Sequence, residues 1–166
     1  MTDLITIQTS LGDISVELDR EKAPQTVENF LLYVNAGFYE NTLFHRVIPN
    51  FMVQGGGFDT NFNQKPAPNR VENEADNGLE NVIGSIAMAR TSDPHSASSQ
   101  FFINTADNSF LNYKSRSTQG WGYCVFGKVT DDLDVVEKIS AIETGSRMGH
   151  QDVPTEDVII KNIVVS

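Results

Sequence analysis

Short segments in which apolar and polar residues alternate restrict most strongly how this chain can fold. Ile5 and Ile7 flank a polar residue, and Ile14, Val16 and Leu18 repeat the pattern. A period of two places such side chains on one face of a β-strand. The turn sequence Ser-Leu-Gly-Asp separates the two segments, which predicts an N-terminal β-hairpin. Similar patterns predict strands over 43–48, 51–54, 85–90, 100–104, 121–129 and 158–165.

Two segments have helical rather than strand periodicity. Pro24 suits the first turn of a helix, and Phe30 and Val34 lie on one face of it. Gly37 follows where a glycine commonly ends a helix. A second helix is predicted over 132–142 from its apolar spacing. Many short strands with only two helices predict a mainly β fold, a closed antiparallel barrel whose open ends the helices cover.

The composition is that of one ordinary globular domain and excludes several kinds of site. The chain has 166 residues, 39% of them hydrophobic, which fits a single domain over 1–166. Cys124 is the only cysteine, so neither an internal disulfide nor a zinc site built on several cysteines is possible. A formal net charge of -10 argues against a nucleic-acid partner. We expect no metal and no cofactor.

Neither a secretion signal nor a membrane span is expected. The first basic residue is Arg20, and no apolar run reaches the length of a signal sequence or a transmembrane helix. These features predict a cytoplasmic protein, and nothing suggests more than a monomer. The polar segment 57–81, rich in Asn, Pro and Glu, is predicted to be a long ordered loop.

The segment 44–56 holds the densest group of candidate functional residues. On a strand, Phe44, Arg46 and Ile48 would share one face and His45 the other, where we expect it to be structural. After Pro-Asn, the strand over 51–54 would return close by, bringing a phenyl ring, a thioether and an amide near the guanidinium. The alternative is a surface ion pair for Arg46 and a solvated glutamine.

Two later segments add aromatic residues. Phe101 and Phe102 should point to opposite faces of a strand, the first into the core and the second toward a cleft. Phe110-Leu111 and Trp121-Gly122-Tyr123 follow, although single aromatic residues more often pack in a core than line a binding surface.

With these segments in view, the sequence resembles the cyclophilins, which are peptidyl-prolyl cis-trans isomerases. The similarity covers nearly the whole chain and is densest over 44–56, 87–90, 99–103 and 125–129. Residues 73–79 and 89–91 resemble the short cytoplasmic bacterial branch of the family. The resemblance implies an eight-stranded antiparallel β-barrel capped by two α-helices.

The resemblance also implies a role for particular residues. Arg46 corresponds to the catalytic arginine, and Phe51, Met52, Phe102 and Leu111 correspond to a pocket for the proline ring. The remaining substrate-binding positions it implies are Gln54 and Gln100 beside the peptide backbone, Ala89, Arg90 and Thr91 along it, and Phe110 and Tyr123 at the groove.

Two of these positions differ from the animal cytosolic pattern. Phe110 replaces a tryptophan and Tyr123 replaces a histidine, and both changes are typical of bacterial members. Because the indole N–H that helps to hold cyclosporin is missing, we expect this drug to bind weakly. The implied partners are proline-containing peptides and unfolded or flexible protein segments.

These residue types suit the implied reaction. Rotation about an Xaa-Pro bond meets a barrier of about 18–20 kcal/mol from amide resonance and breaks no covalent bond. In the twisted transition state the proline nitrogen regains a lone pair, which a fixed guanidinium can hydrogen-bond. Two alternatives remain: a proline-peptide binding module or chaperone with incidental turnover, and a lipocalin-type carrier with a ligand inside the barrel.

Overall fold

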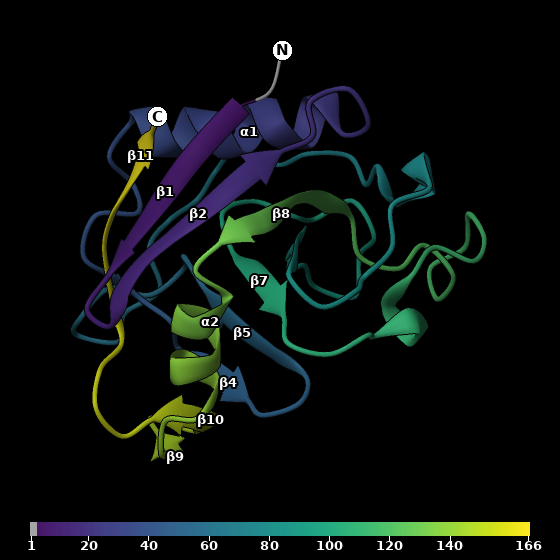
Figure 1. Ribbon diagram of the computed structural model, residues 1–166. Coiled ribbons are helices and arrows are strands. Elements are labelled where there is room, and N and C mark those ends of the chain that lie inside the picture. Colours follow the sequence, from purple (N-terminus) through teal and green to yellow (C-terminus); the bar gives the residue numbers. More distant parts are fainter. Residues whose placement is uncertain (1–2) are drawn as a thin grey trace.

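A strongly curled β-sheet forms most of the molecule (Figure 1). The computed structural model describes residues 3–166. The sheet has nine strands in the order β3-β11-β1-β2-β8-β6-β7-β5-β4. They are β1 (Asp3–Thr9), β2 (Gly12–Leu18), β3 (Thr42–Leu43), β4 (Arg46–Ile48), β5 (Met52–Gly55), β6 (Ser85–Met88), β7 (Phe101–Asn104), β8 (Val125–Asp131) and β11 (Ile159–Val165).

The prediction of a mainly β fold with two helices is confirmed, but the prediction of a closed eight-stranded barrel is wrong. The sheet is open, with β3 and β4 as its edges. These edge strands have two and three residues, and only Phe44 and His45 separate them in the chain. Among the described residues β3 pairs only with β11 and β4 only with β5, so no ladder joins β3 to β4. Isolated backbone hydrogen bonds instead join Leu43 to Gly56 and Phe58, just beyond β5.

The N-terminal hairpin forms as predicted. β1 and β2 pair over their whole length, with Ile5 opposite Val16 and Ile7 opposite Ile14. All four side chains are buried in the main core, because alternate residues of each strand face inward. β11 pairs with the other edge of β1, so the first and last strands lie side by side.

Two helices pack against the sheet at different ends (Figure 1). α1 (Pro24–Asn35) begins at the predicted proline and is followed by Gly37. The φ of Gly37 is 71°, a backbone conformation that residues with a side chain rarely adopt. Its Phe30 packs among other core aromatic rings, including Phe101 and Phe126. α2 (Leu133–Ser140) contacts β2, β4 and β5 and is shorter than the predicted 132–142 helix.

Several element boundaries differ from the predicted ones. The predicted strand 43–48 is interrupted at Phe44 and His45, and the predicted strand 121–129 begins only at Val125. The hairpin of β9 (Thr144–Arg147) and β10 (His150–Pro154) was not predicted, because its residues show little apolar alternation. Two short 3₁₀ helices complete the elements, η1 (Ala75–Asn77) within the predicted long loop and η2 (Ser109–Leu111).

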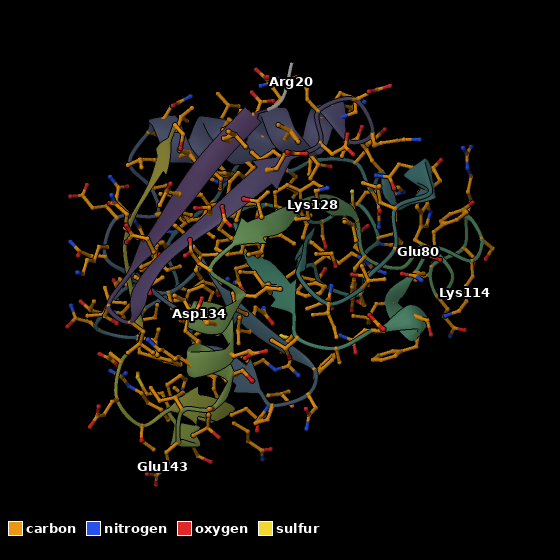
Figure 2. All side chains as sticks on the ribbon, in the orientation of Figure 1. Arg20, Glu80, Lys114, Lys128, Asp134 and Glu143 are labelled. Carbon is orange, nitrogen blue, oxygen red and sulfur yellow. The ribbon has the colours of Figure 1, made fainter. Side chains whose placement is uncertain are left out.

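Charged side chains lie at the surface, as Figure 2 shows for Glu80, Lys128 and Asp134. Within residues 3–166, every buried polar side chain is uncharged or a histidine, and no Asp, Glu, Lys or Arg is buried. None of the helices in this part of the chain is long and apolar enough to cross a membrane.

Candidate functional site

Four neighbouring strands place one side chain each in a row across the sheet. Arg46 on β4 pairs with Gln54 on β5, Gln54 pairs with Phe102 on β7, and Phe102 pairs with Ala87 on β6. Their neighbours in the chain, such as Val53, point into the main core. The strands therefore pack a core on one face and present the row on the other.

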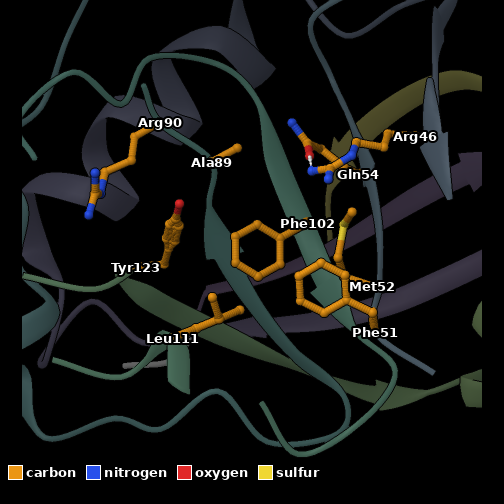
Figure 3. Close-up of a pocket in the computed structure, with 9 residues that line it drawn as sticks. All are labelled: Arg46, Phe51, Met52, Gln54, Ala89, Arg90, Phe102, Leu111 and Tyr123. Carbon is orange, nitrogen blue, oxygen red and sulfur yellow. Dashed lines mark hydrogen bonds between the residues drawn. The ribbon is translucent and has the colours of Figure 1, made fainter. Parts of the chain in front are cut away.

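A pocket of about 140 Å³ opens over this row (Figure 3). It is smaller than the roughly 300–1,000 Å³ of pockets for drug-sized ligands, so it suits one compact side chain. It is lined by nine of the residues that were predicted to bind the substrate or to be catalytic: Arg46, Phe51, Met52, Gln54, Ala89, Arg90, Phe102, Leu111 and Tyr123.

The pocket has an apolar floor and aromatic walls. Met52 and Phe102 are almost fully buried beneath it, together with Ala87 and Val125. The Tyr123 ring stands edge-to-face against Phe102, with ring centroids 5.8 Å apart. Such packing fixes the walls before any ligand arrives.

The Arg90 side chain packs against the Tyr123 ring on the side away from Phe102 (Figure 3). Its guanidinium lies 4.6 Å from the centre of the Tyr123 ring, and its Nε donates to the Gly122 carbonyl at 3.0 Å. A second donation, from Nη1 to the Thr91 carbonyl, fixes the other end of the group. Figure 3 shows Arg90 on the far side of Tyr123 from Phe102, so the Arg90 side chain supports the pocket wall.

Arg46 stands at the opposite side of the pocket with its side chain exposed. Its Nη1 donates to Gln54 Oε1 at 3.4 Å, and Gln54 Nε2 donates to Gln100 Oε1 at 3.0 Å. The backbone of Gly57 lies so close to Gln100 that a Cβ there would overlap the Gln100 side chain. Two amides in series, those of Gln54 and Gln100, thus give the Arg46 guanidinium a preferred direction at this side of the pocket.

Three predicted residues lie just outside this lining. Thr91 and Gln100 line an adjoining hollow that begins beyond the Gln54–Gln100 hydrogen bond. Phe110 is 62% exposed and stacks on Phe51, with ring centroids 5.8 Å apart. The structure therefore brings the predicted residues into one continuous region.

The predicted grouping of Phe44 with Arg46 is wrong, because the chain leaves strand geometry between β3 and β4. Phe44 points into the main core with Val47, while Arg46 points outward. His45 is buried, as its predicted structural role requires, and packs against Phe58 with ring centroids 4.4 Å apart. Burial, with the nearby charges of His150 and Arg46, lowers the pKa of His45 to about 4.

Cys124 is a buried core residue, as predicted. It lies in the main core, with Sγ 3.5 Å from Thr26 Oγ1. Burial raises the pKa of its thiol to about 11, so the nucleophilic thiolate is disfavoured.

The sequence patterns did not reveal a group of four asparagines beneath the pocket, three of them buried. Asn81, Asn104, Asn108 and Asn112 form a hydrogen-bonded chain there. The only sequence signal is the spacing of four between the last three residues, which carries little information in a segment that is not α-helical.

The site offers a compact pocket with an apolar floor and, at its rim, a guanidinium that hydrogen-bonds Gln54. No cluster of three or more His, Cys, Asp or Glu residues within 3–166 is arranged to hold a metal ion. The pocket lining itself contains no carboxylate, cysteine or histidine. Its groups can therefore bind and polarise, while none of them is an evident nucleophile.

Known sequences similar to this chain share one family. Residues 4–165 match the family described as cyclophilin type peptidyl-prolyl cis-trans isomerase/CLD. Peptidyl-prolyl cis-trans isomerase B of Escherichia coli is 55% identical over 163 residues, covering 98% of this chain and 99% of that protein. Peptidyl-prolyl cis-trans isomerase cyp18 of Streptomyces antibioticus is 54% identical and covers 95% of both chains.

Solved structures agree with this assignment. A cyclophilin type peptidyl-prolyl cis-trans isomerase of Cryptosporidium parvum superposes with a TM-score of 0.80 at 28% identity, covering 100% of this chain and 98% of that one. A crystal structure of the same enzyme in the presence of the dipeptide Ala-Pro gives a TM-score of 0.78, with 98% of both chains covered. With a family match along almost its full length and two bacterial relatives above 50% identity, the chain belongs to the cyclophilin-type peptidyl-prolyl cis-trans isomerases.

Proposed function

We propose that the isomerase activity resides in the pocket beside Arg46, and that Arg46 is its catalytic residue. The observation that carries the proposal is the position of a hydrogen-bonded guanidinium at the rim of a small pocket with an apolar floor. A proline ring is compact and apolar, and its nitrogen would lie at the rim when the ring fills the pocket.

The chemistry follows from the electronic structure of the peptide bond. Amide resonance, the source of the rotational barrier of about 18–20 kcal/mol, is lost when the bond twists. The proline nitrogen then carries a lone pair that can accept a hydrogen bond from Arg46. Because the planar amide offers no such acceptor, this contact stabilises the transition state more than the substrate, which is what lowers a barrier.

The apolar walls support the other half of the reaction. Phe51, Met52, Phe102 and Leu111 would hold the proline ring while the preceding residue rotates. Removing water around the ring also strengthens the Arg46 contact, because the effective dielectric constant falls. The Cryptosporidium enzyme, with Ala-Pro present in its crystals, supports a proline-containing ligand for this site.

The main chain beside the pocket would bind the peptide backbone. The backbone N–H and C=O of Arg90 make no hydrogen bond to another residue within 3–166. Arg90 is itself half-buried and lines the pocket. Ala89 and Thr91 flank this free pair, and Gln54 and Gln100 offer amide groups opposite. An extended peptide could pair here as an added strand does.

The wider proposal is a single monomeric domain over 1–166 that acts on flexible or unfolded protein segments in the cytoplasm. The near-complete coverage of the bacterial relatives supports one domain, and a lone cysteine suits a reducing compartment.

The decisive test measures kcat/KM for a proline tetrapeptide with Arg46→Ala, Arg46→Lys and, as the control, Lys161→Ala at an exposed position of β11. Loss of one preorganised transition-state donor should lower the rate by about 10²–10³-fold in Arg46→Ala. Arg46→Lys should recover little, because an ammonium lacks the rigid planar donors. A loss below about threefold would refute the catalytic role and favour a binding module in which turnover is incidental.

A further inference from the structure

Four asparagine side chains form a directed chain beneath the pocket. Asn108 Nδ2 donates to Asn104 Oδ1 at 2.7 Å, Asn104 Nδ2 donates to Asn81 Oδ1 at 3.0 Å, and Asn81 Nδ2 donates to Asn112 Oδ1 at 3.1 Å. Asn104 also donates to Ser85 Oγ at 2.8 Å. Each amide therefore uses its donor group on the next oxygen, an arrangement in which the bonds polarise one another.

Three of the four side chains are buried away from solvent. Asn104 is 0% exposed, Asn81 1% and Asn108 4%, while Asn112 at the end is half-buried. Removing one buried amide would leave the donor or acceptor of its neighbour unpaired, which is costly away from water. The four side chains consequently have one well-defined arrangement.

Two members of the chain, Asn108 at one end and Asn81 next to the other, bind backbone carbonyls on opposite walls of the pocket. Asn108 Nδ2 also donates to the Phe51 carbonyl at 2.8 Å, and Asn81 Nδ2 donates to the Tyr123 carbonyl at 3.3 Å. The third wall is attached through the backbone, because the Leu111 N–H donates to Asn108 at 2.9 Å and its carbonyl accepts from Tyr123 at 2.9 Å.

No β-ladder within residues 3–166 joins the Phe51 wall of the pocket to the Leu111 and Tyr123 walls. Between the end of β7 and the start of β8, residues 105–124 contain η2 but no strand. Leu111 and Tyr123 both come from this segment, and Phe51 comes from the turn between β4 and β5. Two isolated backbone hydrogen bonds, from Thr105 N–H to the Phe51 carbonyl at 3.0 Å and from Asn108 N–H to the Asn81 carbonyl at 2.8 Å, join the same segments. The asparagine side chains add to these bonds the cross-links that a ladder would otherwise supply.

We propose that Asn81, Asn104, Asn108 and Asn112 are positioning residues that set the spacing between the Phe51 side and the Leu111–Tyr123 side of the pocket. The inference rests on the proposed function of that pocket. Catalysis by preorganised groups is sensitive to small displacements, so loosening this chain should reduce turnover even in a fully folded enzyme.

The test compares Asn108→Ala and Asn112→Ala with Ile163→Val, a destabilising core control on β11 far along the sheet from the pocket. The kcat and KM for a proline tetrapeptide are measured at a temperature where urea titration shows each variant to be folded. The Leu111 and Met52 methyl chemical shifts are recorded on the same samples. Asn112→Ala, at the half-buried end, covers the case in which Asn108→Ala does not fold.

We expect kcat to fall roughly tenfold in the asparagine variants, with a smaller change in KM and shifted Leu111 methyl signals. Ile163→Val should lose stability and keep the kcat. Wild-type kcat and unchanged methyl shifts in the folded asparagine variants would overturn the inference. If Arg46→Ala is inactive in the same assay, that result refutes the asparagine role alone, whereas an active Arg46→Ala refutes the proposed function.

Discussion

Arg46 and Gln54 are directly paired across β4 and β5, and their side chains meet on the pocket face with Arg46 Nη1 3.4 Å from Gln54 Oε1. A cross-strand pair keeps both side chains on the same face at a fixed separation. Gln54 is held in turn by Gln100, so an exposed arginine acquires a preferred direction. This relationship explains how a flexible side chain could act as a preorganised donor.

Replacing Gln54 with alanine should therefore weaken catalysis without removing the proposed catalytic group. We expect kcat/KM for a proline tetrapeptide to fall roughly tenfold, because the Arg46 guanidinium loses the partner that directs it. The matched control is Gln151→Ala at an exposed position on β10, which should leave the rate unchanged. Wild-type kinetics in Gln54→Ala would show that Arg46 needs no orientation by this amide.

His45 should make stability depend on pH in the mildly acidic range. The pKa of His45 is lowered from 6.5 to about 4 by burial and by the charges of His150 and Arg46. Between these two values the unfolded chain binds a proton that the folded protein does not, so stability falls as pH falls from about 6.5 to about 4. At about 1.36 kcal/mol for each pKa unit, the loss is roughly 3 kcal/mol.

Urea unfolding at pH 7 and at pH 4.5 measures this effect. His45→Phe keeps an aromatic ring beside Phe58 and should show a clearly smaller loss of free energy of unfolding than the wild type. The control is His95→Gln, since His95 is exposed and should leave the dependence in place. Equal pH dependence in His45→Phe and the wild type would assign the effect to other groups.

Cys124 should be unreactive in the folded enzyme. With a pKa of about 11, only about one thiol in a thousand would be ionised at pH 8, and the side chain is 4% exposed. We expect an aromatic disulfide reagent to label no thiol in the native protein and one thiol for each chain in urea. Rapid labelling of the native protein at pH 8 would contradict the burial of this group, and Cys124→Ser provides the blank.

Phe110→Trp should strengthen cyclosporin binding. The Phe110 ring is exposed and stacked on Phe51, so an indole in its place could present its N–H to a ligand in the groove. One added hydrogen bond should tighten Kd roughly tenfold by isothermal titration calorimetry. Phe110→Leu, which adds no donor, serves as the control, and an unchanged Kd in Phe110→Trp would show that the donor is not what limits binding.

The sequence predicts the local parts of this fold well. The β1–β2 hairpin follows from alternation within one short segment, and α1 begins at Pro24 because a proline there loses no helical hydrogen bond. Barrel closure could not be predicted in this way, because it depends on whether two very short edge strands pair. The position of Phe44 was missed for a related reason, since strand periodicity ends where β3 ends.

The candidate site was predictable where strand alternation and family resemblance reinforce each other. Arg46, Gln54 and Phe102 occupy alternating positions on short strands, so their common face follows once the strands are known. Asn104 and Asn108 escaped prediction because asparagine usually indicates a turn, and only tertiary structure shows that their amides are buried and paired.

The row formed by Arg46, Gln54, Phe102 and Ala87 has a consequence for how the protein can be divided. The neighbouring strands β5 and β7 come from distant parts of the sequence, and Tyr123, which forms one wall of the pocket, lies further along the chain than either. No short peptide cut from this chain can carry the pocket, and a fragment would need everything from β4 through β8 before the walls could meet. Because the pocket depends on these long-range pairings, we expect it to form more slowly than a local element such as the β1–β2 hairpin.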